Sequence, residues 1–377
     1  MKILIDNAVP LNVGDAALVF ALENNLRDRN TVEFSTLKVE KVSSIYPDYK
    51  WYKSFLNKKI YNLLWRVKSV WKFLIFLRLT IFKNEYKDSN VIISAPGGYI
   101  HSYYGIEQRM FILYICKKYL KKRVGIYSQS IGKLNSRDKK ILFKYGKDLD
   151  FIYVRDELSF KRINSFGNFN NVTLTKDAAF MLPSYRRNIL NERIIGISVR
   201  EWDVEGRSTK EYTNMIEKIV MHLLNKGYKI EFISTCQGIE GYIDDSVLAE
   251  SIIKKMGLQN NNNVMVDKEF NDLEKLRDKL RNYHAVIGTR LHLCILSMLT
   301  NIPALNISYE EKGKEVYRYL DLEKFTIDYN DKGDFLSTLE KFLIFAETDL
   351  SQLWERIDVI RNEQLKYLKR SLDNENE

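Results

Sequence analysis

The sequence holds few cysteines, few prolines and no long apolar run, and each absence excludes a class of protein. Its 377 residues include only 3 Cys and 5 Pro. Three widely spaced cysteines exclude a disulfide framework and disfavour a zinc site. An apolar share of 45% excludes collagen-like and disordered chains. No stretch reaches the ~18 apolar residues of a spanning helix, and polar residues follow MKILI too early for a signal peptide. We therefore expect a cytoplasmic protein.

The length and the order of apolar runs predict two α/β domains. A chain of 377 residues suits two domains of ~100–200 residues each. Apolar runs typical of strands alternate with helical stretches, which favours parallel sheets covered on both faces. The alternation stops after Pro183 and then restarts. We expect an N-terminal domain at 1–183, a linker at 184–192, a second domain at 193–335 and a helical segment at 336–377.

The expected elements make both domains doubly wound and Rossmann-like, facing one another across a cleft. Pro96-Gly97-Gly98 is expected to end the strand at 91–94, and ligands are expected beyond the carboxyl ends of the strands. Expected strands lie within 1–9 and at 91–94, 123–128, 150–154, 172–174, 194–199, 228–234, 264–266, 285–287 and 304–307. Expected helices lie at 16–26, 109–120, 156–164, 209–226, 244–256, 271–280, 291–300 and within 336–372.

One segment accounts for most of the net charge of +10. Residues 51–83 hold eight basic side chains, no acidic one and many aromatic residues. One interpretation is a helical hairpin packed on its own domain, with a solvated basic face. The other is a helix lying on an anionic membrane, which would place the protein at the inner face of the plasma membrane. Nucleic acid is disfavoured, because no nucleic-acid-binding motif accompanies the segment.

Two clusters of polar and glycine residues follow early strands. Asn12, Gly14 and Asp15 stand where a strand passes into a helix, and they suit either a helix cap or a ligand contact. Gly97, Gly98 and Tyr99 follow a second strand. Their glycines allow close approach of a ligand, but no P-loop pattern follows, so a plain turn is the alternative.

Two arginines end strands in the two halves of the chain. Arg155 ends the run 151–154, and Arg200 ends the run 194–199. Either guanidinium can reach a ligand beyond its sheet, or it can pair with a neighbouring carboxylate such as Asp156.

The most informative cluster follows the strand at 285–287. Gly288, Thr289 and Arg290 lead into an apolar helix, with His292 in its first turn. A helix N-terminus offers unpaired N–H groups and a positive dipole, and both favour an anion. Arg290 adds a planar fork for an oxyanion. Lys312 follows the next strand and can bring an ammonium to the same anion.

The ordered set of these motifs resembles the polysaccharide pyruvyl transferase family. It comprises N-x-G-D-x-A, G-G, R-D-E-L-S, S-V-R and G-T-R-L-H, then a proline and Y-x-x-K, over about residues 1–320. The resemblance implies a GT-B-like fold of two domains. It also implies transfer of pyruvate from phosphoenolpyruvate onto two hydroxyls of a sugar, as a ketal.

The resemblance also implies roles for the residues. Arg155, His292 and Lys312 occupy the essential basic positions, and Arg290 belongs to the same R-x-H motif. The reaction of phosphoenolpyruvate needs a proton donor and acceptor, and together with the resemblance this need predicts that His292 is the general acid and base. Residues predicted to hold the donor or stabilise the departing phosphate are Gly288, Thr289, Arg290, Arg200, Arg155 and Lys312. Residues predicted to face the acceptor are Asn12, Gly14, Asp15, Gly97, Gly98 and Tyr99.

Phosphoenolpyruvate is a co-substrate in this scheme, which demands no metal or other cofactor. The acceptor is a sugar of a cell-surface polysaccharide or of its lipid-linked precursor. Two alternatives stay open: a glycosyltransferase that uses a nucleotide sugar, and a non-catalytic scaffold of glycan assembly at a membrane. A preference for nucleotide over phosphoenolpyruvate would distinguish the first of these.

Overall fold

The structure is a computed structural model that describes residues 1–54, 68–188, 193–204, 206–239, 241–331 and 333–373. Its contacts divide the chain into two compact units. Unit 1 contains residues 1–11, 18–181 and 362–377, and unit 2 contains residues 12–17 and 182–361. The domain limits expected from the sequence stay a prediction.

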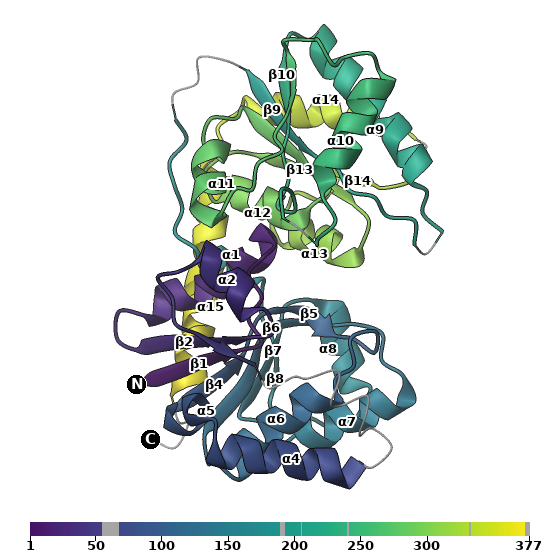
Figure 1. The fold of residues 1–377 in the computed structure, drawn as a ribbon. Helices are drawn as coiled ribbons and strands as arrows, with labels where there is room; N and C mark the ends of the chain where they lie inside the picture. Colours follow the sequence, from purple (N-terminus) through teal and green to yellow (C-terminus); the bar gives the residue numbers. More distant parts are fainter. Residues whose placement is uncertain (55–67, 189–192, 205, 240, 332, 374–377) are drawn as a thin grey trace. The chain divides into compact units, whose positions relative to one another are not determined.

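Unit 1 is built on a parallel sheet of eight strands in the order β3-β2-β1-β4-β6-β7-β8, with β5 paired to β6. The central strands are buried along most of their length, because helices cover both faces of the sheet (Figure 1). The strands are β1 (Lys2–Asp6), β2 (Thr31–Thr36), β3 (Trp51–Lys53), β4 (Val91–Ser94), β5 (Gly97–Ile100), β6 (Arg123–Ile131), β7 (Phe151–Val154) and β8 (Val172–Leu174).

The helices of unit 1 pack on opposite faces of its sheet. Ile152 of β7 lies in a core cluster with residues of α4 (Lys68–Ile81), α6 (Glu107–Lys118) and α7 (Ser136–Gly146). The next residue, Tyr153, contacts Tyr367 of α15 (Ser351–Leu372) on the other face. The remaining helices are α1 (Val13–Leu26), α2 (Val39–Ile45), α5 (Asn84–Asp88), α8 (Glu157–Asn164) and the 3-10 turn η1 (Ala178–Met181).

Unit 2 is built on a second parallel sheet, of six strands in the order β11-β10-β9-β12-β13-β14. Its strands are β9 (Ile194–Ser198), β10 (Lys229–Phe232), β11 (Val264–Val266), β12 (Ala285–Gly288), β13 (Ala304–Ser308) and β14 (Thr326–Asp328). Its helices are α9 (Thr209–Asn225), α10 (Asp245–Lys255), α11 (Leu273–Leu280), α12 (Leu291–Met298), α13 (Glu311–Tyr319), α14 (Phe335–Ala346) and the 3-10 turn η2 (Glu323–Phe325).

The expected fold class is confirmed, with corrections to single elements. Gly97 and Gly98 do not form a turn: they begin β5, which pairs with Gln129 and Ile131 of β6. Residues 51–53 form a strand rather than a helix. The expected C-terminal helical stretch is two helices, because Asp349 caps a new helix by accepting a hydrogen bond from the Ser351 amide at 2.9 Å.

The basic segment 51–83 is described in part, since residues 55–67 lie outside the described ranges. One face of α4 is buried in the core of unit 1 through Trp71, Ile75 and Leu79, which follow one another at intervals of four. This spacing places all three side chains on one side of a helix. Packing on the domain therefore accounts for that face of α4.

The orientation of α4 predicts unequal effects for two neighbouring leucines. Leu79→Ala removes a wholly buried side chain and is expected to lower the free energy of unfolding by about 2–5 kcal/mol. Leu77→Ala is the matched control, because its side chain is exposed and its loss should cost about 0.5 kcal/mol or less. Urea denaturation measures both, and equal losses would contradict this orientation.

Candidate functional site

The strand order of unit 2 places its ligand-binding edge between β9 and β12. From β9 the chain runs outward through β10 to β11, then returns to β12 on the other side of β9. Ligands of open parallel sheets bind at such a reversal, beyond the carboxyl ends of the strands. Those ends carry Ser198 and Arg200 on one side and Gly288, Thr289 and Arg290 on the other.

Ser198 joins the two strand ends. Its hydroxyl accepts hydrogen bonds from the amides of Thr289 at 2.9 Å and Arg290 at 3.1 Å. The Thr289 hydroxyl lies 2.7 Å from the hydroxyl of Tyr212, in α9. A Cβ on Gly288 would clash with the sulfur of Cys294. These contacts fix the point at which α12 begins, with its first-turn N–H groups facing the strand ends.

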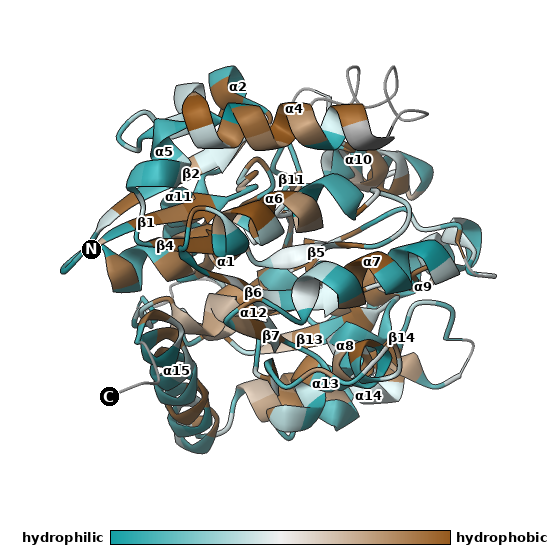
Figure 2. Ribbon diagram, turned by 90° about the horizontal axis from the view of Figure 1, so that it is seen from below, coloured by the Kyte–Doolittle hydropathy of each residue, from teal (hydrophilic) through white to brown (hydrophobic). Residues whose placement is uncertain are grey.

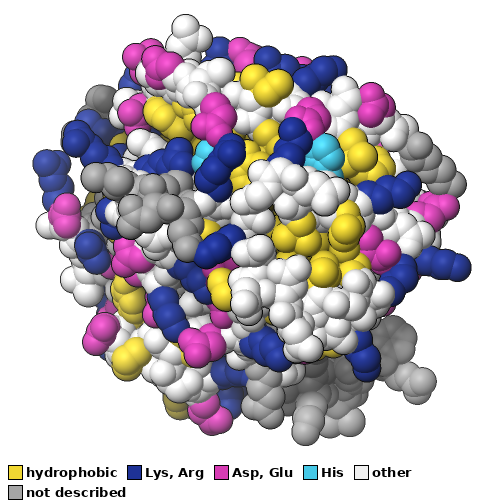
Figure 3. Space-filling view, turned by 90° about the horizontal axis from the view of Figure 1, so that it is seen from above, with side chains coloured by type: hydrophobic (Ala, Val, Ile, Leu, Met, Phe, Trp, Pro, Cys, Tyr) yellow, Lys and Arg dark blue, Asp and Glu magenta, His cyan; other side chains and the backbone are white. Residues whose placement is uncertain are grey.

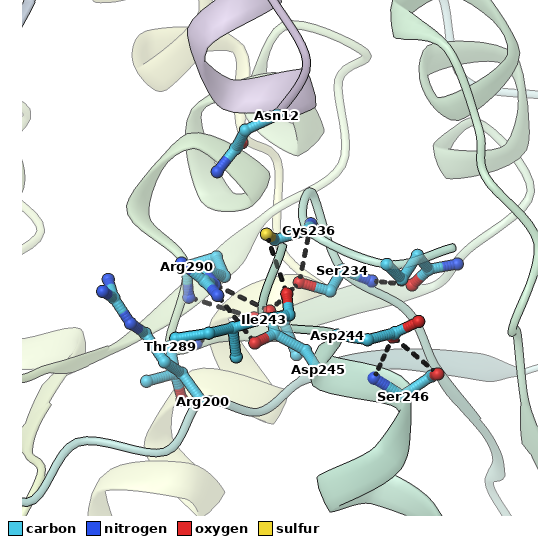
Figure 4. Close-up of polar contacts among 12 residues, drawn as sticks. Asn12, Arg200, Ser234, Cys236, Ile243, Asp244, Asp245, Ser246, Thr289 and Arg290 are labelled. Carbon is cyan, nitrogen blue, oxygen red and sulfur yellow. Dashed lines mark hydrogen bonds and ion pairs between the residues drawn. The ribbon is translucent and has the colours of Figure 1, made fainter. Parts of the chain in front are cut away.

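Arg290 forms a buried, two-pronged ion pair with Asp245, the first residue of α10. Its Nε donates to Oδ2 at 2.7 Å, and Nη2 donates to Oδ1 at 2.6 Å (Figure 4). Burial by itself lowers the pKa of Arg290, but the hydrogen bonds and charge of Asp245 outweigh burial and raise it. Ser234 also donates to Asp245. Two nitrogens of the guanidinium are thus held by protein, where the sequence predicted a contact to donor.

The N-terminal motif N-x-G-D-x-A, residues 12–17, belongs to the same unit as His292, although about 280 residues separate the two. The amide of Val13 donates to the carbonyl of Thr235 at 2.9 Å, just beyond β10. Asn12 Oδ1 accepts from the Gly14 amide at 2.8 Å. A Cβ on Gly14 would lie 2.7 Å from Nδ1 of His292. Glycine at position 14 therefore permits the backbone to approach this imidazole.

Asp15 adds a carboxylate beside these groups. Its side chain is exposed, and its charge acts on the half-buried Tyr242 and the buried Cys236. Burial, reinforced by Asp15, raises the pKa of Tyr242 to about 12. Burial also raises the pKa of Cys236, while the nearby Arg290 opposes that shift.

Arg200 lies between aromatic rings at the end of β9. Its guanidinium carbon is 4.4 Å from the ring centre of Trp202 and 4.5 Å from that of Tyr309, and Nη1 donates to the Tyr309 hydroxyl. Tyr329 donates to the Arg200 carbonyl at 2.9 Å. The rings hold the cation without neutralising its charge.

Lys312 follows β13, the neighbour of β12 in the sheet. It lies in the first turn of α13, is about one third exposed and pairs with Glu310. Nine of the predicted residues therefore lie in unit 2. They are Asn12, Gly14, Asp15, Arg200, Gly288, Thr289, Arg290, His292 and Lys312.

The other four predicted residues lie in unit 1, at the carboxyl ends of its strands. Arg155 is buried and pairs with Asp177 at 2.8 Å, and its Nε donates to Ser130 at 2.9 Å. The pairing partner is thus Asp177, while Asp156 caps α8. The remaining three residues, Gly97, Gly98 and Tyr99, belong to β5.

The chain of unit 1 reverses between β1 and β4, and a polar network missed by the sequence analysis lies there. Asp6, at the end of β1, accepts hydrogen bonds from Tyr86 at 2.5 Å and from Ser35. Burial raises the pKa of Asp6. Tyr99 lies in contact with Ser94, at the end of β4, with 2.6 Å between the hydroxyls, and burial raises its pKa to about 12.

The described residues contain neither a metal-binding cluster nor a membrane-spanning helix. No group of three or more His, Cys, Asp and Glu side chains within these residues is arranged to hold a metal ion. No described helix has the length and apolar content to cross a membrane.

Solved structures with similar folds cover nearly the whole chain. A glycosyltransferase from Rickettsia africae matches with a TM-score of 0.65 at 9% identity, over 99% of both chains. HepE from Anabaena, in complex with UDP and glucose, matches at 0.61 and 10%, over 98% of both chains. The UDP-forming trehalose-phosphate synthase of Burkholderia xenovorans matches at 0.60 and 11%, over 99% of this chain and 100% of that one. At such identities they show the fold alone, which is GT-B-like as expected.

Sequence comparison is more specific. The amylovoran biosynthesis protein AmsJ of Erwinia amylovora is 28% identical over 272 residues, which are 67% of this chain and 65% of AmsJ. The match thus spans just under two thirds of that relative. The model of the polysaccharide pyruvyl transferase family matches residues 12–311, from Asn12 of the N-terminal motif to the residue before Lys312. With four fifths of its length matched, including the residues gathered around the start of α12, the chain belongs to the polysaccharide pyruvyl transferase family.

Proposed function

We propose that this protein transfers the enolpyruvyl group of phosphoenolpyruvate onto two hydroxyls of a sugar, forming a pyruvate ketal and releasing phosphate. One observation carries the proposal: the Gly14 backbone meets His292 at the start of α12, beside the Arg290–Asp245 pair. Family membership supports the reaction type. The acceptor is proposed to be a sugar of a cell-surface polysaccharide or of its lipid-linked precursor, and the name of AmsJ supports a polysaccharide product.

The donor needs several cations and N–H donors, because it carries both a carboxylate and a phosphate. The start of α12 supplies N–H groups and a positive dipole. Arg200 and Lys312 supply charge from the ends of the flanking strands β9 and β13. Two nitrogens of Arg290 donate to Asp245. We therefore assign Arg290 to fixing the start of α12 and, through its third nitrogen, to a contact with phosphoenolpyruvate. Arg155 is assigned to the reaction by family resemblance.

His292 is proposed as general acid and base. The imidazolium gives a proton to the methylene carbon of phosphoenolpyruvate, and the first sugar hydroxyl bonds to the neighbouring carbon while its proton returns to His292. The bond from that carbon to the phosphate oxygen then breaks. The second hydroxyl closes the ketal ring at the same carbon, and its proton leaves with phosphate.

The acceptor is proposed to face Asn12, Gly14 and Asp15, together with Gly97, Gly98 and Tyr99 of unit 1. Asp15 has an exposed carboxylate, and carboxylates accept hydrogen bonds from hydroxyls. Gly98 has open space around its α-carbon, since a Cβ there would meet no atom within 4 Å. This space suits a close approach of ligand to the backbone.

The donor assignment predicts which ligand stabilises the protein. Phosphoenolpyruvate at 100 times its Kd should raise the stability of the folded state by about 2.7 kcal/mol, seen as an increase in Tm. UDP-glucose and UDP-N-acetylglucosamine are the comparison ligands, and neither should raise the Tm. A shift with a nucleotide sugar and none with phosphoenolpyruvate would make the chain a glycosyltransferase instead.

The acid and base assignment predicts a specific loss of turnover. His292→Ala should lower kcat by about 10²–10⁴-fold and leave the thermal shift with phosphoenolpyruvate in place. His222→Ala is the matched control, because His222 lies in α9 of the same unit and contacts Glu340. Phosphate release in the presence of acceptor measures both variants. A kcat close to wild type for His292→Ala would refute the assignment.

The ion pair predicts unequal losses of stability when two adjacent aspartates are replaced. Asp245→Asn removes the counter-charge of the buried Arg290 and is expected to cost about 3–5 kcal/mol of stability. Asp244→Asn should cost less, about 1 kcal/mol, because asparagine keeps the cap on the Ser246 amide and loses only the hydrogen bond that the Gly238 amide donates to Oδ2. Urea denaturation distinguishes them. Similar losses in both variants would show that the ion pair does not hold unit 2 together.

A further inference from the structure

Helix α4 has a second apolar face that the core of unit 1 leaves exposed. Its buried face is the row of Trp71, Ile75 and Leu79. The opposite row begins at Val70 and is exposed throughout; its members are Val70, Phe73, Leu74, Leu77, Ile81 and, directly after the helix, Phe82. Figure 2 shows α4 on the outside of the fold, coloured as hydrophobic over most of its length. We call these six residues the α4 stripe.

The α4 stripe is continuous rather than scattered. Its members in the helix follow at intervals of three, one, three and four, so their side chains lie along one side of the helix. The backbone turn continues to Phe82, whose amide donates to the Arg78 carbonyl at 3.0 Å. Phe73 is 61% exposed and Phe82 is 70% exposed. Monomeric soluble proteins mostly expose large apolar side chains singly, and a row of six marks an interaction surface.

The segment that contains the α4 stripe is basic in sequence. Residues 51–83 include eight basic residues and no acidic one. Among those that the structure describes, Lys72 pairs with Glu107 at 3.0 Å, and Lys83 pairs with Glu85 at 2.8 Å. Arg78 and Lys53 have exposed side chains. On the face of the molecule drawn in Figure 3, by contrast, basic and acidic side chains are interspersed.

We propose that the α4 stripe docks on the surface of an anionic phospholipid bilayer, with α4 lying parallel to it. The apolar row would enter the boundary between headgroups and acyl chains, and the exposed Arg78 and Lys53 would face lipid phosphates. A helix of 14 residues is about 21 Å long, shorter than the ~30 Å hydrocarbon core, so α4 lies on the bilayer. One-sided positive charge favours an anionic lipid surface over a second copy of this chain, which would bring equal charge.

This docking does not rest on the reaction proposed above, and the experiment that tests it does not measure enzyme activity. The experiment measures co-sedimentation of the whole chain with two kinds of vesicle, one of phosphatidylcholine and one of phosphatidylcholine with phosphatidylglycerol. The protein should bind the vesicles with phosphatidylglycerol at low salt. Binding should weaken as salt rises, because the charge contribution is screened.

The matched variants separate the α4 stripe from general surface hydrophobicity. Phe73→Ser/Phe82→Ser should lower vesicle affinity at least tenfold, because each phenylalanine loses most of its transfer free energy. Ile344→Ser/Val359→Ser is the control, since these side chains of α14 and α15 are 65% and 57% exposed, and it should bind as wild type does. All four substituted side chains are exposed, so thermal unfolding should confirm that both variants fold.

Three results would each overturn the proposal. The first is a wild-type chain that stays in solution with phosphatidylglycerol vesicles at low salt. The second is equal vesicle affinity of the stripe variant and the control. The third is a wild-type dimer in light scattering that becomes a monomer in Phe73→Ser/Phe82→Ser, without vesicle binding, which would assign the α4 stripe to contacts between two copies of the chain.

Discussion

The buried pair of Arg290 and Asp245 is the constraint from which the rest of the unit 2 site follows. It joins the start of α10 to the start of α12, and Ser234 ties the same carboxylate to the end of β10. A guanidinium removed from water is costly unless its partner stays in place, so the pair tolerates little movement of either helix. Because His292 lies in the first turn of α12, its position depends on this pair.

The same constraint explains why a glycine stands opposite His292. Once α12 and the segment at 12–17 are both fixed against the end of β10, the space between Gly14 and the imidazole is too small for a Cβ. The solved structures with this fold include glycosyltransferases at about 10% identity, and a shared fold does not decide the chemistry. We propose that the distinction lies in side chains such as His292, placed at a strand end that the fold makes available.

Short apolar runs predicted several strands closely, both in the centre of a sheet and at its edges. The runs at 91–94, 172–174 and 264–266 match β4, β8 and β11 residue for residue. The strands β3 and β14, of three residues each, were missed because they show neither a periodic pattern nor an apolar run. Gly97-Gly98 was left open as a turn or a ligand contact, because glycine suits both. Asp245 was missed for a different reason: an acid at a helix start suits a cap, and only tertiary structure shows that its partner is Arg290, 45 residues away. No local pattern indicates that residues 12–17 belong with unit 2.

The division of the chain also limits how relatives can be recombined. Strand β1, central in the sheet of unit 1 between β2 and β4, precedes the family-matched residues 12–311, and α15 follows them. The last turns of α15 contact that sheet, where Arg123 donates to the carbonyl of Ser371 at 2.7 Å. A chimera that exchanged residues 12–311 between two relatives would thus graft a foreign sheet onto a resident central strand and a resident C-terminal helix. Compatible exchanges would have to carry the two ends of the chain along with the middle.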